Sequence, residues 1–142
     1  MKVREGMVTN PVTARLDDLV YEAAKTMRDK KIGSIICVDK EKVLGIITER
    51  DLVRRVMAEA KDPKTIKIRD VMSTPVISVS PEEDVVDAAQ LMTRSGVRRL
   101  VVMKGNKLVG ILTSDDLAGN MKRAVEELAT ALYIIGRQSK YK

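Results

Sequence analysis

The chain has 142 residues, of which 44% are hydrophobic and 32% are charged, with a formal net charge of +6 and a sequence pI near 9.5. This composition is typical of a globular protein with a buried core and excludes an intrinsically disordered chain. Histidine is absent and there is one cysteine, which excludes an internal disulfide and the usual zinc sites. No apolar run reaches the roughly 18 residues of a membrane span, and the first residues lack a signal-peptide core, so we expect a cytoplasmic location.

The first half of the chain predicts a short extended piece, a helix, two strands and a second helix. Apolar residues at i, i+3, i+4 and i+7 indicate the first helix. The two strands are apolar runs on either side of a charged turn. Because both runs are nearly continuous, we expect both faces of these strands to be covered. The second helix begins at Thr48. The expected bounds of the other elements are 12–14, 17–29, 34–38 and 43–47.

The second half predicts the same elements in the same order. Its first helix has a strong start signal, with Ser80 as N-cap, Pro81 in the first turn and a glutamate that reaches back. Its second helix begins at Thr113, which lies 65 positions after Thr48. The expected bounds of the extended piece, the first helix and the two strands are 76–79, 81–95, 100–103 and 108–112.

The chain is therefore two copies of one β-α-β-β-α unit. The expected parts are a first repeat at 2–58, a connector at 59–66, a second repeat at 67–120, and a C-terminal helix with a basic tail at 121–142. Neither half looks self-sufficient. We expect the two units to pack together pseudo-symmetrically as one globule with an α/β (α+β) fold.

The last helix is longer than its counterpart in the first repeat. Its apolar residues recur at steps of mostly three or four. Gly136 is a natural helix stop, and residues 137–142 form a basic tail. Two interpretations stay open: the stripe folds back on its own domain, or it forms a contact between two copies of the chain. The stripe comprises Leu117, Met121, Ala124, Val125, Leu128, Leu132 and Ile135.

The most faithful part of the repeat is a strand-to-helix junction. It reads Gly45-Ile46-Ile47-Thr48-Glu49-Arg50-Asp51-Leu52 in the first copy and Gly110-Ile111-Leu112-Thr113-Ser114-Asp115-Asp116-Leu117 in the second. Each copy places a threonine at a helix start and an aspartate three residues later, which is a good N-cap arrangement. Backbone N–H groups and the helix dipole also favour an anion at that place. The duplication of the whole motif favours a binding role over a simple cap.

Catalytic and metal-binding roles have little support in the residues. Cys37 lies inside the apolar run 35–38, so we expect a buried and inert thiol. Without histidine, no pair of groups is spaced as a nucleophile and its base would be. We therefore expect no enzyme activity and no metal site.

Three further stretches belong with the two junctions. They are Met7-Val8-Thr9-Asn10-Pro11-Val12-Thr13, its counterpart that begins at Met72, and Gly96-Val97-Arg98-Arg99-Leu100-Val101-Val102. Together these motifs resemble those of tandem cystathionine-β-synthase-type (CBS) domains, often called a Bateman module. The resemblance covers about residues 2–120, and the order and duplication of the motifs make it specific.

Members of that family bind adenine-containing ligands in the cleft between paired repeats. By resemblance, Asp51 and Asp116 accept hydrogen bonds from the ribose hydroxyls, because a carboxylate offers only acceptors to the diol. Thr48 and Thr113 donate to phosphate. The residues implied at the base pocket are Thr13, Ala14, Ser78 and Val79. Those implied to close the cleft are Gly33, Ser34, Ile35, Arg98, Arg99 and Leu100.

The two repeats differ in charge at equivalent places. Arg98 and Arg99 stand where the first repeat has Gly33 and Ser34. A guanidinium clamps a phosphate through two hydrogen bonds, whereas Gly-Ser cannot. Inside the junction motif, Arg50, which we include among the binding residues, is replaced by an aspartate in the second repeat. The second pocket is therefore the more acidic one near the ribose.

The leading hypothesis is a non-catalytic, energy-sensing regulatory module that binds AMP, ADP or ATP, with S-adenosylmethionine also open. Such a module signals by conformational change to an effector protein, which the sequence does not identify, and by resemblance we expect a homodimer. The alternative is a nucleic-acid-binding regulator that uses the basic surface. That alternative is weakened because aromatic residues, which stack on bases, make up 2% of the chain. We expect no membrane partner.

Overall fold

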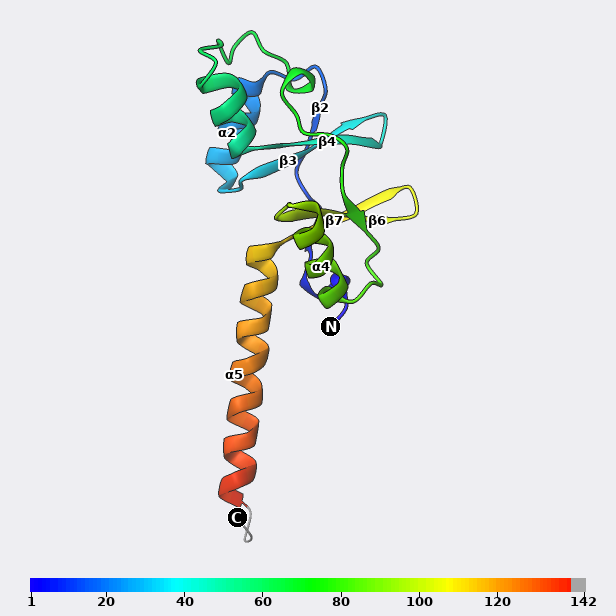
Figure 1. Ribbon diagram of the computed structural model, residues 1–142, viewed down its shortest axis with the longest axis vertical. Helices are drawn as coiled ribbons and strands as arrows, with labels where there is room; N and C mark the ends of the chain where they lie inside the picture. Colours follow the sequence, from blue (N-terminus) through cyan, green and yellow to red (C-terminus); the bar gives the residue numbers. More distant parts are fainter. Residues whose placement is uncertain (139–142) are drawn as a thin grey trace.

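The computed structural model describes residues 1–138. Two small units of sheet and helix lie one above the other, and one long helix projects away from them (Figure 1). Both units have the order β-α-β-β-α. The expected fold class and the internal repeat are therefore confirmed.

The first unit contains β2 (Thr13–Arg15), α2 (Val20–Lys30), β3 (Ser34–Asp39), β4 (Lys42–Thr48), α3 (Glu49–Leu52) and the π-helical turn η1 (Val53–Met57). Its sheet has the order β2-β3-β4. Strands β2 and β3 run parallel, and β3 and β4 form an antiparallel hairpin. This arrangement brings the start of β2 to the same edge of the sheet as the end of β4 and the start of α3.

The second unit contains β5 (Ser78–Val79), α4 (Val85–Ser95), β6 (Arg99–Lys104), β7 (Lys107–Thr113) and α5 (Ser114–Gln138). Strands β5 and β6 are parallel, and β6 and β7 form an antiparallel hairpin. The sheet has the order β1-β7-β6-β5, and its first strand comes from a distant part of the chain.

That strand is β1 (Val8–Thr9), which pairs antiparallel with β7. The helix before it, α1 (Val3–Gly6), also packs on the second unit, and Val3 is fully buried in the second core. The N-terminal segment thus crosses over to the unit that follows later in the chain. This long-range exchange was not expected from the sequence.

The stretch at residues 66–73, called the connector from here on, does the same for the first unit; the connector expected from the sequence, 59–66, ends where this stretch begins. Ile68 of the short 3-10 helix η2 (Ile68–Asp70) is buried in the first core, and Ser73 forms a β-bridge with Ile46 of β4. The expected boundaries, 2–58 and 67–120, follow the repeat in the sequence. In space, each unit is completed by the segment that precedes the other copy's motif.

The two segments at residues 1–9 and 66–73, called the leading segments below, decide where the first helix of each unit begins. Val20 N donates to Ile66 O at 2.9 Å, and Val85 N donates to Met1 O at 3.0 Å. Because the residues before them are held extended by these contacts, the helices begin at 20 and 85. The expected starts at 17 and 81 are wrong for this reason.

The expected N-cap, Ser80, is also wrong. Asp84 caps α4, since Val86 N donates to Asp84 Oδ1 at 2.8 Å. Ser80 and Glu83 close the turn that precedes the helix, where Ser80 N donates to Glu83 Oε1 at 3.2 Å. The Ser-x-x-Glu pattern therefore marks a turn here.

Each junction glycine is required by a close approach. A Cβ built on Gly45 would stand 2.5 Å from Met72 Sδ, and one built on Gly110 would stand 2.7 Å from Met7 Sδ. Both methionines belong to the leading segments that lie across these strands. The glycine of the motif is therefore what lets each leading segment bond to the strand.

The central strands β3 and β6 are covered on both faces. Ile35 lies in the first core and Leu100 in the second. Their neighbours Ile36 and Val101 are equally buried, with 0% and 1% exposure, but belong to neither core. They lie at the junction between the units, which confirms the expectation from the nearly continuous apolar runs.

Helix α5 differs from the expectation in two ways. It continues to Gln138, so the predicted stop at Gly136 is wrong. The left-handed glycines of the described chain are Gly96 and Gly105, and a glycine that stays helical costs only about 1 kcal/mol relative to alanine. The predicted basic tail begins inside this helix with Arg137, and residues 139–142 lie outside the described part.

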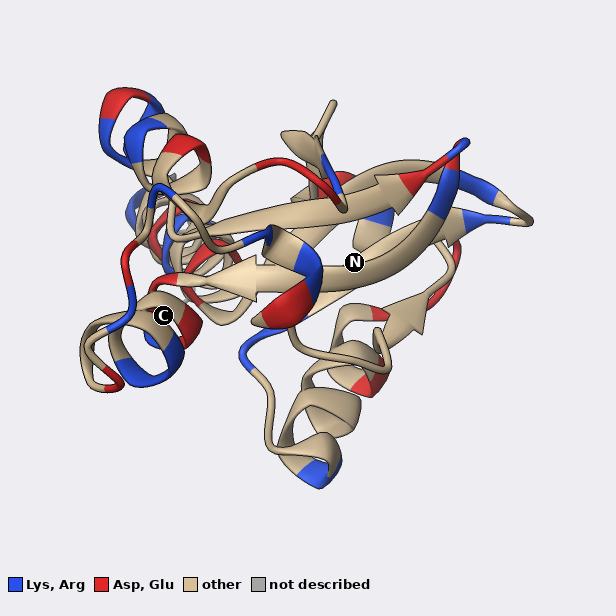
Figure 2. Ribbon diagram, turned by 90° about the horizontal axis from the view of Figure 1, so that it is seen from above, with Lys and Arg blue, Asp and Glu red and all other residues tan. Residues whose placement is uncertain are grey.

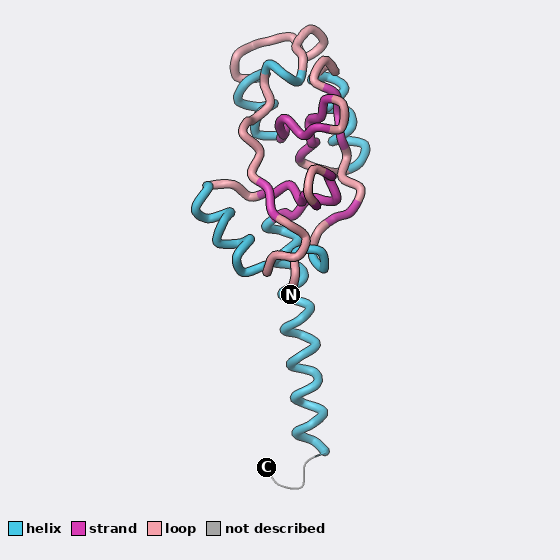
Figure 3. Tube along the Cα trace, turned by 90° about the vertical axis from the view of Figure 1, so that its right-hand side faces the viewer, coloured by secondary structure: helices cyan, strands magenta, loops and turns pink. Residues whose placement is uncertain are grey.

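The helix also does not fold back on its own domain. Leu117 is its last residue in a core, and its apolar side chains from Met121 onwards are exposed. Two views at right angles show it leaving the globule along a straight path (Figures 1 and 3). The first of the two interpretations of the stripe is therefore wrong.

Charges of both signs are spread over the molecule. Seen from above, basic and acidic segments alternate along the ribbon (Figure 2). Among residues 1–138, no helix combines the length and the apolar character that crossing a membrane requires.

Candidate functional site

Two clefts open where the units meet, one at each strand-to-helix motif, with volumes of about 390 and 340 Å³. We name them the Asp51 cleft and the Asp116 cleft. The Asp51 cleft is lined by Ile46, Thr48, Glu49, Arg50, Asp51, Ser73, Pro75, Val76, Ile77, Gly96, Val97, Arg98, Arg99 and Val101. The Asp116 cleft is lined by Val8, Asn10, Pro11, Val12, Lys31, Ile32, Gly33, Ser34, Ile36, Arg99, Ile111, Thr113, Asp115 and Asp116. Each cleft takes residues from both units.

The Asp51 carboxylate is already held by the protein. Its Oδ2 accepts from Thr48 N at 3.0 Å and from Thr48 Oγ1 at 3.1 Å, and its Oδ1 accepts from Ser73 Oγ at 2.9 Å. Arg55 Nε lies 3.9 Å from the same Oδ1. The residue is only 6% exposed. Asp51 therefore ties the start of α3 to the connector as well as lining the cleft.

The Asp116 carboxylate is in a different state. Asp116 N donates to Thr113 Oγ1 at 3.1 Å, so the cap is made through the threonine. Within residues 1–138, no side chain or backbone group donates to the Asp116 carboxylate. The position of Ser73 is taken by Val8 and that of Arg55 by Asn120, 65 positions away in each case. Two of the groups that hold Asp51, the Ser73 hydroxyl and the Arg55 guanidinium, are therefore replaced in the second cleft.

The threonines differ in the same way. The hydroxyl of Thr48 donates to the Asp51 carboxylate. Both hydroxyl oxygens accept from the backbone of the aspartate three residues later, Thr48 Oγ1 from Asp51 N at 3.2 Å and Thr113 Oγ1 from Asp116 N at 3.1 Å. The O–H of Thr113 does not donate to its aspartate and is left to donate elsewhere. The second cleft thus keeps both a free acceptor and a free donor at the start of its helix.

Most of the predicted site residues come together at these clefts. The Asp51 cleft contains the predicted Thr48, Arg50, Asp51, Arg98 and Arg99. The Asp116 cleft contains the predicted Gly33, Ser34, Arg99, Thr113 and Asp116. Each cleft therefore joins the helix start of one repeat to the strand entry of the other.

Six predicted residues do not line either cleft. The side chains of Ile35, Val79 and Leu100 are buried in the two cores. Ala14 packs against the first core, while Thr13 and Ser78 are exposed on β2 and β5. The strands β2 and β5 begin after the cleft, so the chain has already turned away when it reaches these positions.

The residues that take their place precede them in the chain. Pro11 and Val12 line the Asp116 cleft, and Pro75 and Val76 line the Asp51 cleft. These were part of the repeated Met-x-Thr motif, so the motif carried the signal. Lys31 was missed altogether, and its only sequence signal is that it stands at the end of a helix where the second repeat has a glycine.

Arg99 lines both clefts. Its guanidinium reaches from β6 of the second unit to the first unit, where a Cβ built on Gly33 would stand 2.9 Å from Arg99 Nη2. Gly33 therefore leaves the space that this guanidinium occupies. One cation is shared between two potential anion sites.

The charges of the two clefts are unequal. The Asp51 cleft carries three basic side chains, Arg50, Arg98 and Arg99, against two acidic ones. The Asp116 cleft carries Lys31 and Arg99 against two acidic side chains. One of these, Asp115, has its Oδ1 3.6 Å from Arg98 Nη2, with both side chains exposed.

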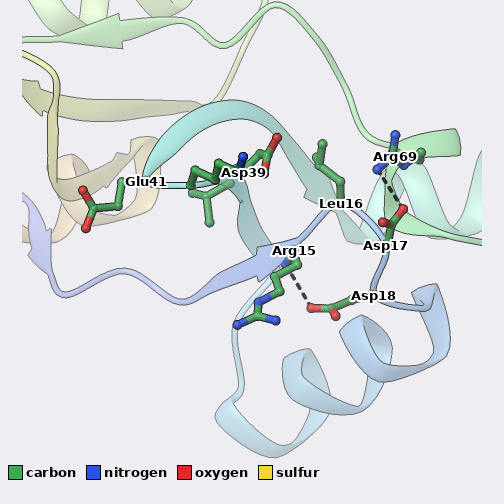
Figure 4. Close-up of a pocket in the computed structure, with 9 residues that line it drawn as sticks. Arg15, Leu16, Asp17, Asp18, Asp39, Glu41 and Arg69 are labelled. Carbon is green, nitrogen blue, oxygen red and sulfur yellow. Dashed lines mark hydrogen bonds and ion pairs between the residues drawn. The ribbon is translucent and has the colours of Figure 1, made fainter.

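A larger hollow of about 640 Å³ lies on the outer side of the first unit. Figure 4 shows Asp18 beside the backbone of Arg15, whose N–H donates to Asp18 Oδ2 at 2.9 Å, and Arg69 beside Asp17. Arg69 Nη2 lies 2.7 Å from Asp17 Oδ1. Because neither helix-start motif lines it and only the first unit and Arg69 contribute to it, this hollow is not the candidate site.

Cys37 is buried, as expected. Burial raises the pKa of its thiol to about 12. A thiol that stays protonated at neutral pH is a poor nucleophile, which confirms the expectation of an inert cysteine.

The geometry of two clefts between paired repeats agrees with a match to known proteins. The model of the CBS domain family matches residues 3–58 and 68–123. The chain belongs to the CBS domain family. It is a CBS domain pair, a regulatory module.

Relatives of this CBS pair occur in bacteria and archaea. The CBS domain-containing protein YhcV of Bacillus subtilis is 34% identical over 137 residues, which cover 96% of both chains. Protein MK0525 of Methanopyrus kandleri is 42% identical over 108 residues, or 75% of this chain and 55% of that protein. The pair thus spans nearly all of one relative and about half of the other.

Solved structures share the fold of this CBS pair. The CBS domain protein NE2398 superposes with a TM-score of 0.80 at 28% identity, over 85% of this chain and 97% of that one. The CBS domain pair of protein MJ0100 was solved with 5′-methylthioadenosine and S-adenosylmethionine. It superposes with a TM-score of 0.79 at 27% identity, over 87% of this chain and 98% of that one. A hexameric CBS-CP12 protein from bloom-forming cyanobacteria superposes with a TM-score of 0.76 at 30% identity, over 93% of this chain and 86% of that one.

Proposed function

We propose that this CBS pair binds an adenosine nucleotide, AMP, ADP or ATP, in the Asp116 cleft and acts as a non-catalytic sensor. One observation carries the proposal: a free carboxylate stands at a helix start between the two units, beside the shared guanidinium of Arg99. The adenosine ligands of the MJ0100 pair support the class of ligand.

The ribose is assigned to Asp116. A vicinal diol presents two O–H donors, and an ionised carboxylate offers acceptors that are strengthened by its charge. Asp51 has the same position in its own repeat, but its oxygens already accept from Thr48 and Ser73. A ribose in the Asp51 cleft would have to share or displace those bonds.

The phosphate is assigned to Arg99, Lys31 and the hydroxyl of Thr113. A guanidinium can donate two parallel hydrogen bonds to a phosphate, and a lysine adds a point charge. These groups line the same cleft as Asp116. The acidic neighbour Asp115 disfavours additional phosphates, so we expect AMP to bind at least as well as ATP.

The base is assigned to the apolar part of the cleft. Val12, Ile32, Ile36 and Ile111 line it together with Pro11. Aliphatic side chains can cover both faces of a purine, and backbone groups beside a proline-containing turn can read its edge. This arrangement replaces the base pocket expected at Thr13 and Ala14.

The Asp51 cleft is a second and weaker site for the same ligands. Its three arginines attract phosphate against the negative charge of Glu49, but the Asp51 oxygens are already engaged and leave the ribose without a free acceptor at that position. S-Adenosylmethionine has no phosphate, and its one carboxylate is accompanied by an ammonium and a sulfonium cation, so it gains less than a nucleotide from either set of cations. We therefore rank it below the nucleotides for this chain.

Signalling follows from where the Asp116 cleft lies. Lys31 and Ser34 belong to the first unit, whereas Thr113 and Asp116 belong to the second. A ligand that contacts both units favours the arrangement in which those contacts are made, by its difference in affinity. We propose that an effector protein reads that arrangement, and that the module works as a homodimer.

Isothermal titration calorimetry tests the nucleotide site. The titrated ligands are AMP, ADP, ATP, adenosine, S-adenosylmethionine and GMP. Each is titrated into the unmodified chain, into Asp116→Asn, and into the control Asp115→Asn, which removes a negative charge from the adjacent residue. Losing a charged acceptor costs about 1.5–3 kcal/mol, or roughly tenfold to a hundredfold in affinity. We expect that loss for Asp116→Asn alone. Equal affinities for the two variants, or no heat with any adenosine compound, would refute the assignment.

A further inference from the structure

Helix α5 carries an apolar seam that neither unit uses. Five of its side chains, Met121, Val125, Leu128, Leu132 and Ile135, are 55% to 61% exposed. Leu117 is the last residue of the helix in a core. The equivalent helical segment of the first unit ends at Met57, so the CBS fold itself does not need the part of α5 that carries the seam.

The spacing of the seam indicates what covers it. Its steps are four, three, four and three residues, which is the 3.5-residue period of helices that pack side by side along their length. From the first to the last of these residues the helix rises about 21 Å at about 1.5 Å per residue. A flat sheet or a globular surface would not require this period, so the covering element is a helix.

The residues that flank the seam fit an identical helix. They are Lys122, Ala124, Ala129, Ala131 and Gly136. Flanking charges select the partner in paired helices, and here there is one charge among five mostly small residues. Nothing along the seam repels a second copy, and the small side chains let two backbones approach closely. The other charges of this stretch, including Glu126 and Glu127, lie off the seam.

We propose that α5 pairs with α5 of a second copy of this chain along this seam. The open path of the helix away from the globule leaves room for it (Figures 1 and 3). Burying a side chain of this size removes roughly 60–120 Å² from water. The pair of helices contributes ten such side chains, five from each copy, and each is somewhat over half exposed. The total area buried by the seam is therefore a few hundred Å², which is below the roughly 1,200 Å² of a stable interface. The seam alone therefore forms a dimer that dissociates on dilution.

Sedimentation equilibrium over a wide range of protein concentration tests the pairing. Leu128→Glu places a charge in the middle of the seam, and Thr130→Glu places the same charge on the opposite face as its control. Both positions are exposed, and thermal unfolding checks that both variants remain folded. We expect the unmodified chain and Thr130→Glu to dimerise with similar constants, and Leu128→Glu to need at least tenfold more protein. A monomeric unmodified chain at hundreds of micromolar, or equal dimerisation of the two variants, would overturn the proposal.

Discussion

Ser73 Oγ donates a hydrogen bond to Asp51 Oδ1 at 2.9 Å, and the corresponding place in the second unit is held by Val8, which pairs with Ile111 as Ser73 pairs with Ile46. The two helix-start aspartates therefore have the same sequence motif and different availability. One is part of the structure that joins the connector to the first unit. The other faces a cleft with its acceptors unused by the described chain.

Replacing Ser73 with valine should make the first cleft resemble the second. The loss of one hydrogen bond to a nearly buried carboxylate should lower the free energy of unfolding by about 1.5–3 kcal/mol, which urea denaturation measures. On the proposed function, the freed Asp51 should then bind ribose, and calorimetry should show tighter binding at a second site. Unchanged stability would mean that the Ser73 bond contributes nothing.

Arg99 is predicted to distinguish nucleotides from the nucleoside. Arg99→Ala should lower the affinity for AMP by roughly tenfold to a hundredfold, because a charged hydrogen bond to phosphate contributes about 1.5–3 kcal/mol. Adenosine, which has no phosphate, should bind with nearly unchanged affinity. Arg98→Ala is the comparison variant, because Arg98 lines the Asp51 cleft and reaches the Asp116 cleft only through its ion pair with Asp115. It should change AMP binding in the Asp116 cleft much less than Arg99→Ala does. Equal losses for AMP and adenosine would assign Arg99 a structural role.

Gly110 is predicted to be intolerant of a methyl group. A Cβ there would stand 2.7 Å from Met7 Sδ and 2.9 Å from Val8 O, so Gly110→Ala should push β1 away from β7. Overpacking of this kind typically costs about 1–3 kcal/mol. Gly119→Ala is the control, since a Cβ at that helical position meets nothing within 4 Å and should be neutral or stabilising. Similar unfolding free energies for both variants would show that the leading segment is not tightly held.

The features that could be predicted from the sequence are local ones. Nearly continuous apolar runs on either side of a charged turn placed β3, β4, β6 and β7 within one residue, and the Thr-x-x-Asp motif located both clefts. The exchange of the leading segments depends on contacts such as Val3 with the second core, more than 75 positions away, which no local pattern contains. The start of α4 was predicted at Pro81 because the capping pattern at Ser80 is also the pattern of the turn that it closes. The helix begins at Val85, whose backbone N–H donates to Met1 O.

The site was predicted less completely than the fold for a geometrical reason. Whether Ile35 or Ile36 faces the cleft depends on the register of β3, and the two faces of that strand are equally apolar. The motif identifies the region, but a shift of one residue moves a side chain from the cleft to the core. Lys31 lies in the cleft only because the turn after α2 returns the chain to the junction.

Cys37 is predicted to weaken the fold at high pH. Its thiol has a pKa of about 12 in the folded chain, above the value of about 8.5 for a free thiol. The folded state therefore binds this proton more tightly, and the contribution to stability is complete at neutral pH and is lost as the pH rises toward 12. Between about pH 9 and 10 the chain should lose about 1 kcal/mol more stability than Cys37→Val. Parallel pH profiles of the two proteins in urea denaturation would contradict this.

The most direct measurement is a crystal structure of the chain grown with AMP. The proposed function predicts electron density for one nucleotide in the Asp116 cleft, with the ribose hydroxyls within hydrogen-bonding distance of the Asp116 carboxylate and the phosphate beside Arg99. AMP bound in the Asp51 cleft with the Asp116 cleft empty, or bound in the outer hollow near Arg15 and Asp17, would contradict it.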